Sequence, residues 1–363
     1  MDSLAARSPQ RAWMAPSHWP SRPSAFVTEL PFFLIMWNML HIHPRPRDWR
    51  VGQAFPTSTR CAMHTQSNAS GITVAVVGPG AIGTTVAAML HEVGRTPVLC
   101  GRTARDQLWL QDGDRRIGVP GPVLSDPAQC DRTVDLIFLA VKATQNAAAA
   151  PWLAALSGPR TVVCALQNGV EQVDSLAPYC PQGRIVPAVV WFPAQAQADG
   201  VIRLRAPARL SLPDTPDAGL VAEALHDTRC AVELVADFHT VAWRKLLQNA
   251  VAGLMALTQR RSGMFARPDI AELALAYLRE GLAVARAEGA ALGDEVPQAI
   301  LDKFQSSPPD LGTSILGDRQ AGRPLEWDIR NGVIARRGRA HGLPTPISDI
   351  VVPLLAAASD GPG

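Results

Sequence analysis

Lysine is scarce in this chain, and its few lysines are candidates for proton transfer. Of 34 basic residues only three are lysine, at positions 142, 245 and 303. A lysine amine can release a proton once burial lowers its pKa, whereas an arginine side chain stays charged. A lysine in such an arginine-rich chain could therefore act as a general acid. The simpler alternative is a lysine that packs its stem on a helix and keeps its amine in water.

Lys245 lies within residues 238–257, which have the apolar periodicity of a helix. Asn249 follows four residues later and Gly253 eight residues later, so all three fall on one stripe of that helix. We expect this stripe to face a binding site, with Lys245 as the proton donor.

Lys142 stands at the end of a strand rather than on a helix. It follows residues 133–141, a nearly continuous apolar run, and Gln145 comes three residues later. A second buried run, residues 161–166, is followed by Asn168 and Gly169. In open parallel sheets, ligands bind beyond the carboxyl ends of the strands. Lys142 and Asn168 are therefore expected at one ligand-binding edge.

A glycine-rich turn supplies the element that would hold a cofactor. It follows the β-branched run at residues 72–77 and precedes an alanine-rich helical segment, and it consists of Gly78, Pro79, Gly80, Ala81, Ile82 and Gly83. Its first glycine permits a tight turn, its second allows close approach of a pyrophosphate, and its third allows the helix to pack on the strand. Placed between a strand and a helix, this pattern predicts dinucleotide binding, and a purely structural turn is the alternative.

The end of the second strand indicates which dinucleotide is bound. NAD enzymes commonly carry an acidic residue there for the ribose hydroxyls, whereas arginine accommodates a 2′-phosphate. Here residues 97–100 lead to Gly101 and Arg102, and the first acid is Asp106. We therefore predict NADPH as cofactor, with Arg102 on the phosphate; a solvated surface arginine is the alternative.

The succession of elements predicts two domains. Further strands are expected at residues 185–192 and 201–212, with residues 232–235 closing the sheet, and a helix at residues 147–156. From residue 237 onward only helical patterns remain, at residues 238–257, 269–288, 295–304, 327–341 and 347–358. Continuous apolar strands are typical of a parallel sheet covered on both faces. The fold class is thus an α/β Rossmann-type dinucleotide-binding domain, residues 71–236, followed by an all-α domain, residues 237–360.

Residues 1–70 differ in composition from the rest of the chain. They contain four of the nine Trp and eight of the 31 Pro, without helical or strand periodicity. The apolar patch at residues 26–42 is interrupted by Glu29, Pro31 and Asn38 and is too broken to span a bilayer; a membrane-surface anchor is the alternative. We expect a disordered or non-native extension, because Met63 stands nine residues before the first strand. Residues 1–62 should then be dispensable for folding and activity.

Charge and cysteine content narrow the possible partners. Residues 1–62 carry seven Arg and three acidic residues, which leaves 27 basic and 29 acidic residues in the remainder. A nearly neutral catalytic part gives no indication of nucleic-acid binding. The six cysteines have no metal-ligand spacing, so we expect reduced thiols, no metal site and a cytoplasmic protein.

Five motifs, in this order, resemble those of the ketopantoate reductase family (2-dehydropantoate 2-reductases) between about residues 72 and 346. They are the glycine turn; Lys142 with Gln145; Asn168 with Gly169; Trp243, Lys245 and Asn249; and Ser314 followed twelve residues later by Glu326. The resemblance implies an NADPH-dependent reductase whose helical domain is similar to the C-terminal domain of 6-phosphogluconate dehydrogenase.

The resemblance also implies roles for these residues. Lys245 would be the general acid, and Glu326 would help to orient both the substrate and Lys245. Asn249, Ser314 and Asn168 would hold the keto acid. Lys142, Gln145 and Asn168 would serve the cofactor and the active site, together with the glycine turn and Arg102.

One position departs from the family pattern. The family helix usually carries a second substrate-binding Asn four residues beyond Asn249, and this chain has Gly253 there. Loss of a buried hydrogen bond costs of order 1–3 kcal/mol. Reductase chemistry is thus better supported than the identity of the substrate.

We expect reduction of 2-dehydropantoate in pantothenate biosynthesis, by a monomer or homodimer. A reductase of another branched 2-oxo acid is the closest alternative. A non-catalytic NADP(H)-binding sensor on the same fold is the alternative from another class, but such a sensor has no need of a proton donor.

Overall fold

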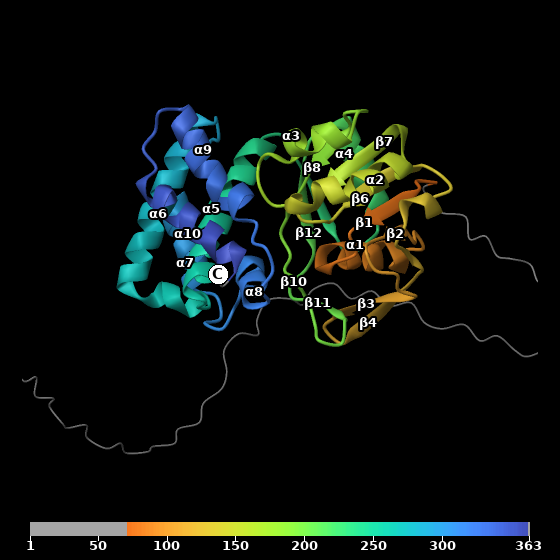
Figure 1. Cartoon of the computed structure of the whole chain (residues 1–363), viewed down its shortest axis with the longest axis horizontal. Coiled ribbons are helices and arrows are strands. Elements are labelled where there is room, and N and C mark those ends of the chain that lie inside the picture. The colour runs from red at the N-terminus through yellow and green to blue at the C-terminus, as the bar shows by residue number, and fades with distance from the viewer. Residues whose placement is uncertain (1–70, 362–363) are drawn as a thin grey trace, which may run out of the picture. The chain divides into compact units, whose positions relative to one another are not determined.

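The computed structural model describes residues 71–361, and all of them belong to one compact unit of the chain. The predicted extension at residues 1–70 lies outside the described residues and stays a prediction. Figure 1 shows the strands gathered in one half of the unit and the helices α5 to α10 in the other. An α/β half followed by a helical half confirms the fold class predicted from the sequence.

Six parallel strands form the main sheet, in the order β5-β2-β1-β6-β7-β8. Their bounds are β1 Val74–Val77, β2 Val98–Cys100, β5 Val123–Leu124, β6 Val134–Leu139, β7 Ser157–Ala165 and β8 Ile185–Pro187. The sequence order changes direction between β1 and β6, which is where open sheets of this kind bind their ligands. The glycine turn follows β1, and Lys142 follows β6.

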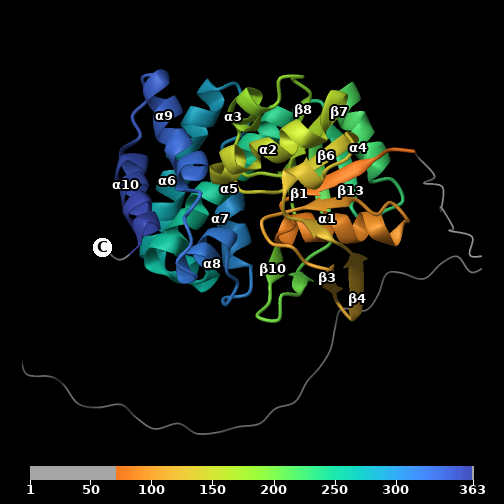
Figure 2. The ribbon, with the colours of Figure 1, turned by 45° about the vertical axis from the view of Figure 1, so that its right-hand side comes forward.

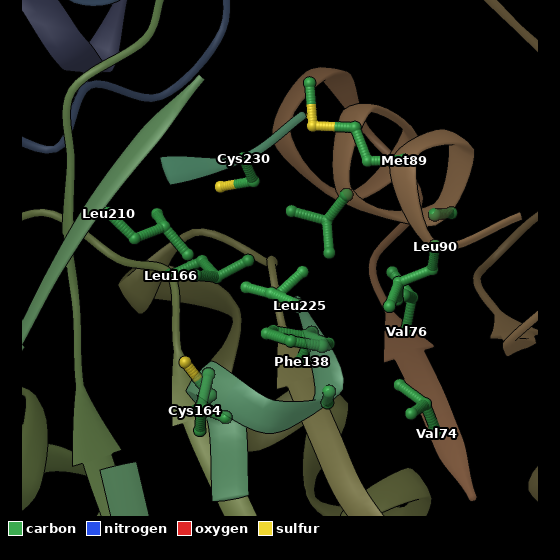
Figure 3. Packing of buried hydrophobic residues seen from close by; sticks show 14 of the residues in the cluster. Val74, Val76, Met89, Leu90, Phe138, Cys164, Leu166, Leu210, Leu225 and Cys230 are labelled. Atoms are coloured by element: carbon green, nitrogen blue, oxygen red, sulfur yellow. The ribbon is translucent and has the colours of Figure 1, made fainter. Parts of the chain in front are cut away.

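Alternate residues of β1 are buried against different helices. Val74 and Val76 belong to the apolar cluster that includes α1 residues such as Leu90, and Figure 3 shows these side chains with Phe138 of β6. Ala75 and Val77 belong to the cluster on the other face, which includes Trp152 of α2. Burial on both faces explains why the strands read as unbroken apolar runs.

The helices of the sheet half follow strands closely in sequence. The α-helices are α1 Ala81–Glu92, α2 Asn146–Leu156, α3 Gln172–Leu176 and α4 Pro216–Ala224. The 3₁₀ turns are η1 Pro127–Gln129, η2 Ala143–Gln145 and η3 Ala177–Tyr179. Helix α4 was not anticipated from the apolar pattern, although Thr215 caps it and Pro216 occupies its first position, which are ordinary signals of a helix start.

Two smaller sheets flank the main one and correct three expectations. One has the order β10-β11-β3-β4 and the other β13-β12-β9. The bounds are β3 Gln107–Asp112, β4 Arg115–Pro120, β9 Val189–Val190, β10 Ala194–Ala196, β11 Ile202–Leu204, β12 Arg209–Pro213 and β13 Ala231–Val235. The hairpin β3–β4 was not anticipated.

The single strands expected at residues 185–192 and 201–212 are each wrong. The first divides into β8 and β9, and the second into β11 and β12, with each pair split between two sheets. Pro207 lies in the gap between β11 and β12, and proline cannot donate a ladder hydrogen bond. The expectation that residues 232–235 close the main sheet is also wrong, because β13 pairs only with β12.

The helical half begins immediately after β13. Its helices are α5 Phe238–Thr258, α6 Pro268–Ala287, α7 Val296–Gln305, α8 Ser314–Gln320, α9 Val333–Ala340 and α10 Pro346–Asp360, with the 3₁₀ turn η4 Ser262–Ala266. Asp237 caps α5 by accepting from the Thr240 amide at 3.1 Å. All five expected helices are present, and α8 is an addition. Figure 2 shows α5 at the side of the helical half that borders the strands.

The helix expected at residues 327–341 is not uniform. Its first part, η5 (Asp328–Gly332), is a π-helix, and α9 continues from it. Arg330 and Asn331 of this π segment are buried, with 2% and 0% of their surfaces exposed. Single π turns inside helices often occur at functional sites, and this one turns two polar side chains inward.

Two further features concern cysteines and membranes. The five cysteines at positions 100, 130, 164, 180 and 230 are free thiols, as expected, while Cys61 lies outside the described residues. No helix within residues 71–361 combines the length and apolarity needed to cross a bilayer.

The glycine turn makes a stability prediction with an internal control. A Cβ at Gly83 would overlap the Gly78 carbonyl oxygen, whereas a Cβ at Gly80 would meet no atom within 4 Å. Gly83→Ala should therefore lower the free energy of unfolding by about 1–3 kcal/mol, the usual cost of overpacking. Gly80→Ala should cost less than about 1 kcal/mol, since only a helix-cap preference is lost. Scanning calorimetry measures both, and equal losses would contradict this packing role.

Candidate functional site

Asn168 joins the sheet half to the helical half. It follows the carboxyl end of β7, and its amide oxygen accepts a hydrogen bond from Asn249 Nδ2 of α5 at 3.2 Å. Its amide nitrogen donates to Glu326 Oε2 at 3.1 Å. Three residues predicted from sequence to lie in one site are thus directly bonded to one another.

Arg330 extends this chain of hydrogen bonds to the fourth predicted residue, Ser314. Its Nη2 donates to Asn249 Oδ1 at 3.4 Å, and its Nη1 donates to Ser314 Oγ at 3.1 Å. The network therefore runs from Ser314 through Arg330, Asn249 and Asn168 to Glu326. Arg330 is a site residue that was not predicted from the sequence, although it stands only four residues beyond Glu326.

Glu326 is almost fully buried, with 6% of its surface exposed. Its carboxylate contacts Asn168, and no ion pair within 4.0 Å joins it to a basic side chain among residues 71–361. Glu326 and Lys245 therefore do not form an ion pair in the structure, and the orientation of Lys245 by Glu326 stays a prediction. Glu326 instead accepts a hydrogen bond from the neutral side-chain amide of Asn168.

Lys245 lies beside an aromatic ring rather than beside a carboxylate. Its Nζ is 4.8 Å from the centre of the Trp191 ring. The guanidinium of Arg209 lies 4.9 Å from that ring centre and the Lys303 Nζ 5.9 Å. An aromatic face attracts cations electrostatically, so Trp191 holds three positive groups close together.

These surroundings shift the acidity of Lys245. Burial, the largest cause, and the positive charges of Lys303, Arg330 and Arg209 together lower the pKa of Lys245 to about 7. A general acid is most effective when its pKa is close to the working pH. Lys245 therefore has the acidity of a proton donor at neutral pH.

Lys142 makes an ion pair between the two halves. Its Nζ lies 2.6 Å from Asp318 Oδ2 of α8, and Asp318 also accepts from Arg323 Nε at 2.9 Å. In both views α8 lies on the side of the helical half that faces the strands (Figure 1, Figure 2). Lys142 thus contacts α8 through Asp318, and this pairing was not predicted from the sequence.

The turn after β1 has the shape needed to hold a dinucleotide. Gly78 has a φ of 91°, which favours glycine. No side chain caps the N-terminus of α1, so the amide groups of its first turn can bind phosphate oxygens. The open space at Gly80 leaves room for a close backbone approach. These three observations fit a pyrophosphate.

The remaining predicted cofactor residues border the same region. Arg102 is exposed two residues beyond the end of β2, and Gln145 is half-buried in η2. Pro79, Ala81 and Ile82 lie in or next to the turn at the start of α1. Their contacts with a cofactor stay predictions.

Position 253 explains the departure from the family pattern. A Cβ at Gly253 would lie 2.9 Å from Asn331 Nδ2 and 3.1 Å from Leu355 Cδ1. Asn331 is held in place because its Nδ2 donates to the Ala250 carbonyl and to the Tyr277 hydroxyl, both at 2.9 Å. A larger side chain at position 253 therefore has no room, and Asn249 is the residue of this stripe that joins the network.

The arrangement can bind and reduce a small polar carbonyl compound. It combines a lysine of near-neutral pKa, two amides, a hydroxyl and a buried guanidinium next to a nucleotide-type glycine turn. No cluster of three or more His, Cys, Asp or Glu side chains suited to a metal ion occurs in residues 71–361.

Comparisons with known proteins point to one family. Residues 74–217 match the family model Ketopantoate reductase PanE/ApbA, and residues 237–359 match Ketopantoate reductase PanE/ApbA C terminal. A 2-dehydropantoate 2-reductase from Mycobacterium tuberculosis is 56% identical over 291 residues, which cover 80% of this chain and 99% of that protein. One from Caulobacter vibrioides is 36% identical, with 79% of this chain and 99% of that protein covered.

A solved structure agrees with the sequence relatives. The dimeric ketopantoate reductase from Staphylococcus aureus has a TM-score of 0.74 and 28% sequence identity, and the match covers 80% of this chain and 100% of that one. The family models together span both halves of the described chain, and the hydrogen-bonded network contains four of the residues that the family resemblance singled out. This chain belongs to the ketopantoate reductase family.

Proposed function

We propose that this chain is a 2-dehydropantoate 2-reductase that uses NADPH to reduce ketopantoate to pantoate in pantothenate biosynthesis. The observation that carries the proposal is Lys245, whose pKa is lowered to about 7 and which shares a helical stripe with Asn249 of the network. Family membership indicates ketopantoate as the substrate, and the relative from Mycobacterium tuberculosis, a 2-dehydropantoate 2-reductase, supports the same activity.

Lys245 supplies the proton in this reaction. When bound, the reduced nicotinamide delivers a hydride to the ketone carbon. The ketone oxygen then gains negative charge, and a positioned ammonium stabilises that charge and protonates it. Burial and the neighbouring cations keep Lys245 weakly basic, so that proton release is easy at neutral pH.

The hydrogen-bonded network positions the substrate for Lys245. Asn249, Asn168 and Ser314 offer amide and hydroxyl groups to the polar atoms of the keto acid. Glu326 fixes the orientation of Asn168 through the 3.1 Å hydrogen bond between them. In this reading Glu326 acts as a positioning residue for an amide rather than as the ion-pair partner of Lys245.

The family implies a nicotinamide cofactor, and Arg102 favours its phosphorylated form. Arg102 is exposed beyond the end of β2, where an arginine can bind the 2′-phosphate of NADPH. The turn from Gly78 to Gly83 holds the pyrophosphate, with Lys142 and Gln145 at the neighbouring strand end.

We further propose a cytoplasmic enzyme that is a monomer or a homodimer. The Staphylococcus aureus relative is described as dimeric, which favours the homodimer.

NADPH oxidation against a panel of 2-oxo acids tests the function. Ketopantoate should give the highest kcat/KM. A higher kcat/KM for another branched 2-oxo acid would make that acid the substrate and leave the reductase activity standing. NADPH binding without turnover of any 2-oxo acid would indicate the sensor and contradict the proposal.

The role of Lys245 predicts a specific loss of turnover. Lys245→Ala should lower kcat by about 100- to 10,000-fold, the usual contribution of a positioned general acid, while NADPH affinity stays close to that of the wild type. Lys245→Arg keeps the charge but cannot release a proton at neutral pH, so it should be nearly as impaired. Steady-state kinetics and NADPH fluorescence titration measure both effects. Wild-type turnover in Lys245→Ala would return the assignment to Lys142.

The lowered pKa predicts the pH dependence of the reaction. Reduction needs protonated Lys245, so kcat/KM, which reports the ionisation of the free enzyme, should fall as the pH rises through about 7. Lys303→Met removes the positive charge that, of the three, lowers the pKa of Lys245 most. The pKa of Lys245, and with it the pH at which kcat/KM falls, should therefore move to higher values. Arg260→Met, at an exposed position just after α5, serves as a charge-matched control. It should leave the pH at which activity falls unchanged. An unchanged pH profile in Lys303→Met would contradict the effect of Lys303 on the pKa of Lys245.

The position of Arg102 predicts a cofactor-specific effect. Arg102→Ala removes a charge that only the 2′-phosphate of NADPH would contact. KM for NADPH should therefore rise by about 10-fold or more, the usual effect of losing a hydrogen bond to a charged group, while KM for NADH stays nearly unchanged. Kinetics with both cofactors make the comparison, and equal effects would show that Arg102 does not contact the phosphate.

A further inference from the structure

Arg330 is a buried cation for which the described chain provides no counter-ion. Only 2% of its surface is exposed, and no carboxylate lies within 4.0 Å of it among residues 71–361. Its two described hydrogen bonds go to neutral oxygens, those of Ser314 and Asn249. Buried charges in proteins are normally paired, because desolvation of an unpaired charge is costly.

The donor groups of Arg330 are not fully used. Its Nε is buried and has no hydrogen-bond partner. The two residues that it contacts, Ser314 and Asn249, are those proposed to hold the keto acid. An anion at this point would meet a guanidinium, an amide and a hydroxyl together.

The nearest acidic residues do not take this role. Burial lowers the pKa of Arg330, and the more distant charges of Glu326 and Asp318 oppose that shift only in part. Asp318 is engaged by Lys142 at 2.6 Å and by Arg323 at 2.9 Å, and Glu326 by Asn168 at 3.1 Å. Both carboxylates thus have other partners.

We infer that Arg330 binds the carboxylate of the 2-oxo acid and makes the site selective for acids over their neutral derivatives. The planar guanidinium suits a carboxylate, because it can donate two parallel hydrogen bonds. Arg330, which lies on η5 and contacts Asn249 of α5, also adds a substrate contact that Gly253 of α5 does not offer. This inference rests on the proposed function and assigns one further specificity residue to it.

The charge of Arg330 is tested with a matched pair of substrates. Ketopantoate is compared with its carboxamide, which keeps the ketone and the hydroxyl but loses the negative charge. Arg330→Met keeps most of the side-chain volume and removes the charge. It should raise KM for ketopantoate by about 10- to 100-fold, the range for losing a hydrogen bond between charged groups, and change KM for the amide by less than about 3-fold. Equal changes for the two substrates would overturn the inference.

Arg95→Met is the matched control for structural damage. Arg95 is also buried, at 7% exposure, and its Nε also lacks a partner. Its hydrogen bonds, however, go to backbone carbonyls in the sheet half, including that of Ala224 at 3.4 Å. Arg95→Met should lower the thermal midpoint and leave the preference for acid over amide unchanged. A preference that falls as much in Arg95→Met as in Arg330→Met would overturn the inference.

Arg330→Lys keeps the test valid if Arg330→Met does not fold. A lysine retains the charge but not the two-pronged geometry. KM for ketopantoate should then rise less than in Arg330→Met, and the preference for acid over amide should persist. Loss of this preference despite the retained charge would count against the carboxylate role.

A binding measurement separates this inference from the proposed function. The 2-oxo acid panel is titrated into the wild type and the variants with NADP⁺ present, and Kd is measured by calorimetry. Weaker binding of 2-oxo acids in Arg330→Met supports the inference whether or not ketopantoate is the best substrate. Equal Kd values overturn it even if the wild type reduces ketopantoate, and no binding of any acid to the wild type overturns both.

Discussion

The two hydrogen bonds of the Asn168 side chain are the interaction on which the site depends. Asn168 extends from the end of β7 and contacts both α5 and Glu326. A primary amide can donate and accept at the same time, so one side chain sets the orientation of an amide on one helix and of a carboxylate on another segment. The parallel sheet fixes the starting point of this connection, because β7 is buried on both faces and cannot shift without disrupting two apolar clusters.

The π segment η5 places two polar side chains in the interior of the helical half. It turns Arg330 toward Ser314 and Asn249, and Asn331 toward Ala250 and Tyr277. Neighbouring residues of an α-helix point in directions about 100° apart, so a regular helix would place these two side chains less favourably for a common core. One local irregularity thereby supplies a charged group to the site and fills the space beside Gly253.

Local signals in the sequence were enough to predict most of the framework. The strands were recognisable because burial on both faces leaves unbroken apolar runs, and the glycine turn because its backbone requirements select glycine. The burial of Arg330 was not predictable, since it depends on the π segment, and the partnership of Lys142 with Asp318 was not, since 176 residues separate them. The hairpin β3–β4 was missed although Gly113 and Asp114 form a two-residue turn between its strands, because its partly exposed residues lack an apolar run.

The position of Lys245 over Trp191, away from any carboxylate at ion-pair distance, has a consequence for covalent chemistry. A lysine with a pKa of about 7 is neutral in about half of the molecules at neutral pH, and a neutral amine is a nucleophile that attacks carbonyl carbons. The amine that protonates a ketone could therefore also condense with it to a Schiff base. Proton donor and nucleophile are two states of one side chain, so the anion that enters the site has a second effect: its negative charge raises the pKa of Lys245, which keeps the amine protonated and unreactive while the ketone is present.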